Sequence, residues 1–247
     1  MSRVVDLTVA ALRTRGDAQL HHYAETLRMA CAAFPPPFGM SWYGEKYREV
    51  AVDRDWFVTS LLANAVKEAE GARDLWRLAS RTGDPTIADK IRLHARDESR
   101  HARLYVAMLD VAFREVLPDE IRPTLRRLSP AYDSHEGPTV ADAWPFASVL
   151  DAVIQINLGE IRTRIHQLLM TPVIMEYCPA ERQRKLTRIL GALMHDETRH
   201  VQYTAELIDD AMAHGHVDFV RGTTLARLDE FNRLTLMQAG ETSFTGS

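Results

Sequence analysis

The sequence predicts an all-α protein whose centre is a four-helix bundle. Apolar residues recur at steps of three and four through four long segments, at about 54–80, 85–117, 140–170 and 179–213, as on the inward face of a helix. The segments form two pairs, separated by a proline-containing stretch at 118–138. Two helix pairs joined by one long crossover are a known layout of four-helix bundles.

One five-residue string occurs in both helix pairs. Asp97-Glu98-Ser99-Arg100-His101 in the first pair is matched by Asp196-Glu197-Thr198-Arg199-His200 in the second. In each copy Glu and His stand three residues apart, so they share one helix face and could bind one metal ion. Surface ion pairs would explain one copy. Two copies in register with the apolar stripe, where an uncompensated carboxylate is costly, indicate two metal ions.

Each of the other two helices adds one glutamate to its inward stripe. Glu68 falls on the stripe of the first helix, whereas Glu70 falls off it, and Glu160 lies on the stripe of the third. The four carboxylates balance two divalent cations, and oxygen and nitrogen ligands favour iron or manganese over softer metals. The predicted metal ligands are Glu68, Glu98, His101, Glu160, Glu197 and His200.

This arrangement resembles the ferritin-like di-iron and di-manganese carboxylate proteins, which include soluble di-iron oxygenases and p-aminobenzoate N-oxygenase-like enzymes. In that family one Glu from each of two helices and a Glu-x-x-His from each of the other two bind the metals. The resemblance implies a ferritin-like four-helix bundle with a long crossover at 54–213. Outside the span of the resemblance, the sequence predicts a helical N-terminal extension at 1–53, packed on the bundle, and a short C-terminal helix with a mobile end at 214–247.

The resemblance also implies roles for residues beside the ligands. In soluble di-iron monooxygenases and the small subunit of ribonucleotide reductase, an Asp before the ligand Glu accepts the ring N–H of the ligand His on the opposite helix. Asp97 and Asp196 hold that position here and would orient the histidines. Arg100 and Arg199 either pair with these aspartates, which we favour, or lie on a solvated helix face.

Three further residues leave alternatives open. His94 lies one turn before Glu98 and is either a seventh ligand or a hydrogen-bonded core histidine. The N-oxygenase family places its third His on the other Glu-x-x-His helix, where this chain has Leu193. Tyr105 holds the position of the reductase radical tyrosine, or is a core aromatic. Arg164 either reaches an anionic substrate group or forms a salt bridge at the rim.

Composition and charge narrow the function classes. The net charge is −4 and no Lys/Arg run forms a patch, which argues against a nucleic-acid partner. No segment has the ~18 apolar residues of a membrane span, so we expect a soluble, cytoplasmic protein. Cys31 and Cys178 stand alone, without a Cys-x-x-Cys pair, so electrons would come from an external donor.

We therefore expect a non-haem di-iron oxygenase that uses O₂ to oxidise a small organic substrate in biosynthesis, by N-oxygenation or C–H hydroxylation. The N-terminal extension and the crossover suit a covered substrate cavity better than a compact storage ferritin. The alternative is a ferritin-like iron-handling or peroxide-removing protein, such as a ferroxidase or a manganese catalase. A homodimer is left open. The residues expected to shape the pocket are Leu61, Leu62, Ala65, Val153, Ile156 and Leu193.

Overall fold

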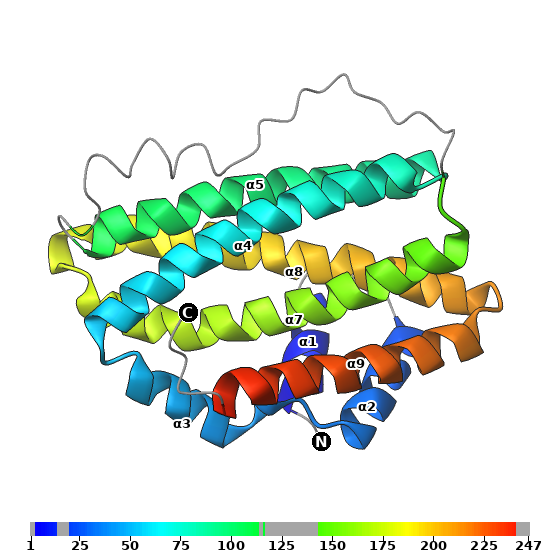
Figure 1. Ribbon diagram of the computed structural model, residues 1–247, viewed down its shortest axis with the longest axis horizontal. Helices are drawn as coiled ribbons and strands as arrows, with labels where there is room; N and C mark the ends of the chain where they lie inside the picture. Colours follow the sequence, from blue (N-terminus) through cyan, green and yellow to red (C-terminus); the bar gives the residue numbers. More distant parts are fainter. Residues whose placement is uncertain (1–2, 14–19, 114–115, 117–142, 241–247) are drawn as a thin grey trace. The chain divides into compact units, whose positions relative to one another are not determined.

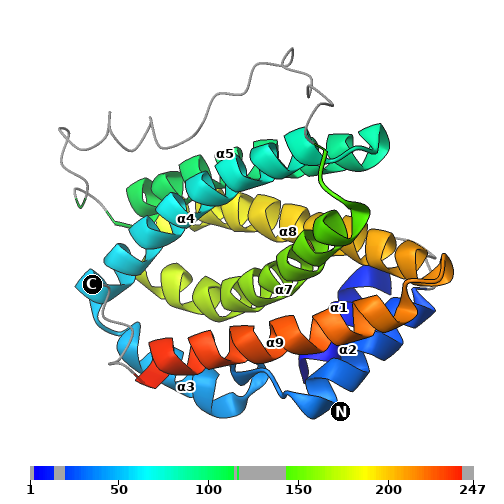
Figure 2. The same cartoon turned by 45° about the vertical axis from the view of Figure 1, so that its right-hand side comes forward.

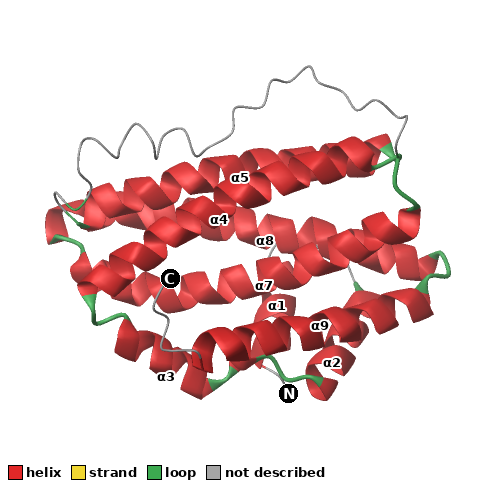
Figure 3. Ribbon diagram, viewed as in Figure 1, coloured by secondary structure: helices red, strands yellow, loops and turns green. Residues whose placement is uncertain are grey.

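The regular structure of the described residues is helical throughout (Figure 3). The computed structural model describes residues 3–13, 20–113, 116 and 143–240. Among these it contains no strand, which confirms the predicted all-α class. The helices are α1 (Arg3–Arg13), α2 (His21–Ala33), α3 (Ser41–Val50), α4 (Arg54–Arg81), α5 (Pro85–Ala112), α7 (Phe146–Tyr177), α8 (Gln183–Ala213) and α9 (Val217–Gly240), with 3₁₀ turns η1 (Pro37–Gly39) and η3 (Ala180–Arg182).

The chain divides into two compact units. Of the described residues, the first unit contains those up to Val50, Leu150–Met170 and those from Met194 onward, and the second contains those within Ala51–Val149 and Thr171–Leu193. Helices α7 and α8 therefore contribute residues to both units. The expected division at 1–53, 54–213 and 214–247 stays a prediction.

In the second unit, α4 and α5 pack side by side (Figures 1 and 2). Asp53 begins α4 by accepting hydrogen bonds from the backbone N–H groups of the first turn, and Asp84 begins α5 in the same way. Pro85 follows at the first helical position, where its missing N–H does no harm. The short connection between the helices makes the pair antiparallel.

In the first unit, the parts of α7 and α8 that belong to it also run antiparallel. Residues of rising number in α7 meet residues of falling number in α8. Asn157 Nδ2 donates to Thr204 Oγ1 at 2.8 Å, and Gln167 Nε2 donates to Glu197 Oε1 at 2.9 Å. Helix α2 joins this pair through Tyr23, whose hydroxyl donates to Asn157 Oδ1 at 2.9 Å.

Several predicted helix boundaries are wrong. The sequence predicts that the third helix ends near residue 170, but α7 continues through Pro172 to Tyr177. Burial of Met170 and Ile174 on either side outweighs the one backbone hydrogen bond that proline removes. Helix α5 ends at Ala112 rather than near 117. Helix α9 is not short: it has 24 residues and follows a turn in which Gly215 has a φ of 96°.

Other expectations fall on residues that the structure does not describe. The predicted crossover at 118–138 and the expected mobile end after residue 240 lie outside the described residues. Within the described part of the chain, no helix combines the length and hydrophobicity that a membrane span requires.

Candidate metal centre

Glu68 of α4 and Glu98 and His101 of α5 converge in the second unit, and we call these three residues the α4/α5 half-site. His101 Nδ1 lies 3.3 Å from Glu98 Oε1 and 3.9 Å from Glu68 Oε2. All three side chains are buried. Two ligands that hold one ion at about 2.1 Å and at right angles are about 3.0 Å apart. The three ligand atoms are therefore close to the spacing of a metal site.

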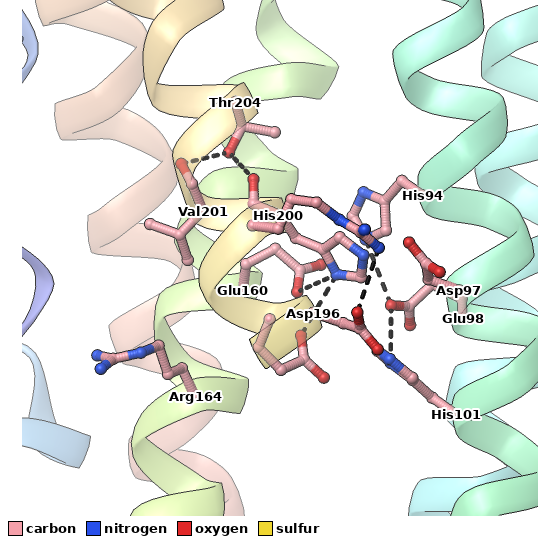
Figure 4. Close-up of polar contacts among 12 residues, drawn as sticks. His94, Asp97, Glu98, His101, Glu160, Arg164, Asp196, His200, Val201 and Thr204 are labelled. Carbon is pink, nitrogen blue, oxygen red and sulfur yellow. Dashed lines mark hydrogen bonds and ion pairs between the residues drawn. The ribbon is translucent and has the colours of Figure 1, made fainter. Parts of the chain in front are cut away.

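Glu160 of α7 and Glu197 and His200 of α8 repeat this arrangement in the first unit, as the α7/α8 half-site. His200 Nδ1 lies 3.5 Å from Glu197 Oε2 and 3.6 Å from Glu160 Oε2. Figure 4 shows the contact between Glu160 and His200. In both half-sites, the Nδ1 atom of a histidine meets one carboxylate from its own helix and one from the neighbouring helix.

Helix register accounts for the inward position of these ligands. Glu68 is buried whereas Glu70, two residues later, is exposed, which confirms the stripe predicted for the first helix. The ligands on α5 and α8 are likewise buried in line with the apolar residues before and after them. Of the residues expected to shape a pocket, Leu61, Ala65, Val153 and Leu193 are buried, and Leu62 and Ile156 are partly exposed. Their role toward a substrate stays a prediction.

The carboxyl of Glu98 has opposing influences on its pKa. Burial alone would raise the pKa, but contacts with Glu68, His101 and His94 hold it well below its usual range. A carboxyl kept ionised in a buried position presents two oxygen lone pairs to a cation. Glu98 is thus charged at neutral pH and suited to bind a metal.

Buried or nearly buried His and Glu side chains in each half-site could help to hold a metal ion. The donors are imidazole nitrogens and carboxylate oxygens alone, a set that fits iron or manganese. The side chains that could take part are the six predicted ligands and His94.

The aspartates that precede the ligand glutamates pair with arginines on their own helices. Arg100 Nη2 donates to Asp97 Oδ1 at 3.1 Å, and Arg199 Nη2 donates to Asp196 Oδ1 at 3.2 Å. Both aspartates are buried, and the arginines lie partly in solvent. The pairing that the sequence favours is present in both copies. The expected contact of each Asp with a ligand His stays a prediction.

His94 and Tyr105 are both buried beside the ligands of α5. His94 is 1% exposed, and its Nε2 atom lies 3.3 Å from Glu98 Oε1. The ring is therefore directed at a ligand carboxylate, a position open to a seventh ligand and to a hydrogen-bonding histidine alike. Tyr105 is buried, and its role as a radical tyrosine stays a prediction.

Arg164 makes contacts that the sequence does not suggest. Its Nε atom donates to Thr198 Oγ1 at 3.1 Å and its Nη1 atom donates to the carbonyl of Leu7 at 3.3 Å. Figure 4 shows the guanidinium turned away from Glu160 and His200. Arg164 thus connects α7 with α8 and α1 by hydrogen bonds rather than by a rim salt bridge. Its expected role toward an anionic substrate stays a prediction.

Gln167 is not among the site residues that the sequence predicts. Its amide donates to the completely buried carboxylate of Glu197 at 2.9 Å. A hydrogen bond to a charged group offsets part of the cost of burying that charge. The only signal in the sequence is its place on the inward stripe, two turns after Glu160.

A buried hydrogen-bond chain behind His200 is also absent from the sequence prediction. Tyr23 donates to Asn157, Asn157 donates to Thr204, and Thr204 Oγ1 donates to the carbonyl of His200 at 2.6 Å. The chain connects α2 with the backbone of a candidate ligand.

No protein-family model, curated protein or solved structure matches this sequence.

Proposed function

We propose that this chain is a ferritin-like di-iron carboxylate protein, in which α4, α5, α7 and α8 form a four-helix bundle and the two half-sites form one dinuclear centre. The observation that carries the proposal is the repetition of one buried arrangement, a Glu from one helix and a Glu-x-x-His from its antiparallel neighbour. The shared five-residue string and the matching His and Glu side chains of the two half-sites support their union in one centre.

Charge supports a pair of divalent cations. Four glutamates placed in a low-dielectric interior would repel one another and would lose most of their hydration. Two divalent ions compensate four negative charges when both histidines are neutral. Zinc usually takes four ligands in a closed tetrahedral site, whereas six ligands shared by two ions fit iron or manganese.

The activity that we infer is oxidation of a small organic substrate with O₂, by N-oxygenation or C–H hydroxylation. Iron bound in this centre would supply the redox chemistry. The electrons would come from an external donor, because the two cysteines, Cys31 and Cys178, lie far apart in the sequence and form no Cys-x-x-Cys pair. The residues of the chain hold and orient the ligands, as Gln167 does for Glu197, and the apolar side chains around the ligands exclude water.

The difference between the half-sites supports an enzyme over an iron store. His94 stands beside Glu98, whereas Leu193 occupies the corresponding place in the second copy. Gln167 stands two turns after Glu160, whereas Leu75 stands two turns after Glu68. The two ions would therefore have unlike surroundings, as suits a centre that receives O₂ and substrate on one side.

Iron loading under anaerobic conditions tests the metal centre. The protein should bind two Fe(II) per chain, and Glu68→Ala, Glu160→Ala and His200→Ala should each lose at least one, since each removes a ligand. Glu70→Ala is the matched control on α4 and should retain both ions, because Glu70 is exposed. Loss of an ion in Glu70→Ala, or two ions in all three ligand variants, would contradict the assignment.

Exposure of the loaded protein to O₂ separates the activities. An oxygenase should develop a long-lived visible absorption band and should oxidise candidate amines or hydrocarbons when a reductant is present. Oxidation of excess Fe(II) to a ferric mineral, without organic products, would favour the ferroxidase alternative. Manganese in the purified protein together with rapid peroxide breakdown would favour a manganese catalase.

A further inference from the structure

A tyrosine and a histidine outside the ligand set share a short hydrogen bond in the first unit. The hydroxyl of Tyr43 on α3 lies 2.7 Å from Nε2 of His166 on α7. Tyr43 is 1% exposed, and the ring of Tyr47 packs edge-on against His166 with centroids 6.1 Å apart. When the proton of the neutral imidazole is on Nδ1, Nε2 accepts the hydrogen bond of the phenol. A buried phenol thus has a base in place to take its proton.

The pair is connected outward to the protein surface. Trp42 precedes Tyr43, and their rings meet edge to face with centroids 5.7 Å apart. Trp42 is 39% exposed, so its indole reaches solvent while Tyr43 does not. Trp42 therefore places an oxidisable ring at the surface, in contact with the buried phenol.

The same pair is connected inward to the α7/α8 half-site. His166 is followed directly by Gln167, whose amide donates to the carboxylate of Glu197. The path from Trp42 to Glu197 thus passes through one aromatic contact, two side-chain hydrogen bonds and one step along the backbone of α7. Every residue of this path lies in the first unit.

We propose that Trp42, Tyr43 and His166 form a redox relay that carries single electrons between the surface and the metal centre. Only the connection of the relay to a metal centre rests on the proposed function. Burial raises the pKa of Tyr43, so the phenol is neutral and must release its proton when it is oxidised. His166 accepts that proton, which avoids a buried, positively charged phenol radical.

Tyr43 gives one electron to its oxidant and its hydroxyl proton to Nε2 of His166, so Tyr43 becomes a neutral phenoxyl radical and His166 an imidazolium. The oxidant is a one-electron acceptor, which oxidised iron held by the proposed ligands would supply. An external one-electron donor at Trp42 then returns the electron to Tyr43, and His166 returns the proton. No atom is gained or lost by the three side chains over the cycle.

Photo-oxidation tests the relay without the chemistry of iron. The full chain is supplied with Zn²⁺, which has no redox chemistry, and a photogenerated Ru(III) tris-bipyridine complex takes one electron from the surface. Trp42 should be oxidised first and then refilled from Tyr43. A neutral tyrosyl radical should appear by transient absorption and electron paramagnetic resonance, and the Tyr43→Phe variant should lack it.

Three variants distinguish the relay from a structural hydrogen bond. His166→Gln can accept the hydrogen bond but not the proton, so radical formation should slow by roughly 100-fold, the low end of a general-base contribution. Trp42→Phe should also slow it, and Tyr47→Phe is the matched control that should leave it unchanged. Circular dichroism checks that each variant is folded.

Two results would overturn the relay: a radical that persists in Tyr43→Phe, or equal rates in His166→Gln and the unmodified protein. Either result would leave the two-iron proposal intact. Conversely, if the protein does not bind two iron ions but Tyr43 is photo-oxidised normally, the two-iron proposal is wrong and the redox pair of Tyr43 and His166 stands.

Discussion

Replacing Gln167 by leucine should weaken the binding of one metal ion and spare the other. Gln167 Nε2 donates to Glu197 Oε1 at 2.9 Å, and Glu197 is completely buried. A hydrogen bond to a charged group contributes about 1.5–3 kcal/mol, and each 1.4 kcal/mol is about tenfold in affinity. We therefore expect roughly 10- to 100-fold weaker binding, the range found when a metal ligand loses its orienting partner.

The substitution acts mainly on the metal-bound state. Without metal, no bound cation requires Glu197 to keep one orientation. With metal, Glu197 must be ionised and held in one orientation, which is what Gln167 provides. Leucine is also the residue two turns after Glu68 in the first pair, at Leu75, so a helix of this kind accommodates it.

The affinities for the two metal ions are measured separately by titration with Mn²⁺ against a chelator. The free Mn²⁺ is read from its electron paramagnetic resonance signal. Gln155→Leu is the matched control, because Gln155 is an exposed amide on the same helix. Unchanged affinity for both ions in Gln167→Leu, or an equal loss at both ions, would refute the role assigned to Gln167.

Four further predictions concern the surroundings of the site. Asp97→Asn and Asp196→Asn should keep the helical circular dichroism but weaken metal binding or activity by roughly 10- to 100-fold; unchanged occupancy and turnover in both would make them surface charges only. His94→Leu should retain two iron ions per chain by metal analysis, and loss of one would identify His94 as a seventh ligand. Tyr23→Phe leaves Asn157 Oδ1 buried without its donor and should lower the free energy of unfolding in urea by about 1–3 kcal/mol, whereas no change would show that the chain behind the ligand helix is dispensable. Because the pKa of Glu98 is lowered in the fold, ionised Glu98 stabilises the protein above its ordinary pKa of 4.5, and this stabilisation is lost as the pH falls through the folded-state pKa. The free energies of unfolding in urea of metal-free Glu98→Gln and of the unmodified protein should therefore converge as the pH is lowered. A difference between them that stays constant with pH would contradict this.

The all-α class and the inward register of the candidate ligands were predictable from sequence. A helix repeats every 3.6 residues, so Glu68 and Glu70 fall on different faces whatever their surroundings. The same local rule places Glu98 and His101 together. Capping by Asp84 ahead of Pro85 is equally local, because the capped N–H groups belong to the next turn of chain. Signals of this kind need no knowledge of the partner helix.

The course of α7 at Pro172 was predictable only in part. Pro172 removes one hydrogen bond, a local effect that the sequence displays. Whether the helix continues depends on how deeply the residues on either side are buried, and Met170 and Ile174 are both in the core. Burial depends on what packs against the helix, which local sequence does not encode.

What the sequence by itself determined is therefore the helical class, the inward positions of the six candidate ligands and the repetition on which the two-ion proposal rests. Only the tertiary structure decided which side chains support them. Gln167 reaches Glu197 and Tyr43 reaches His166 because segments distant in the chain pack at one particular axial offset. The direction of Arg164, toward Leu7 and Thr198, follows from the same packing. An offset of one turn would exchange every such partner while leaving each helix's own apolar stripe unchanged.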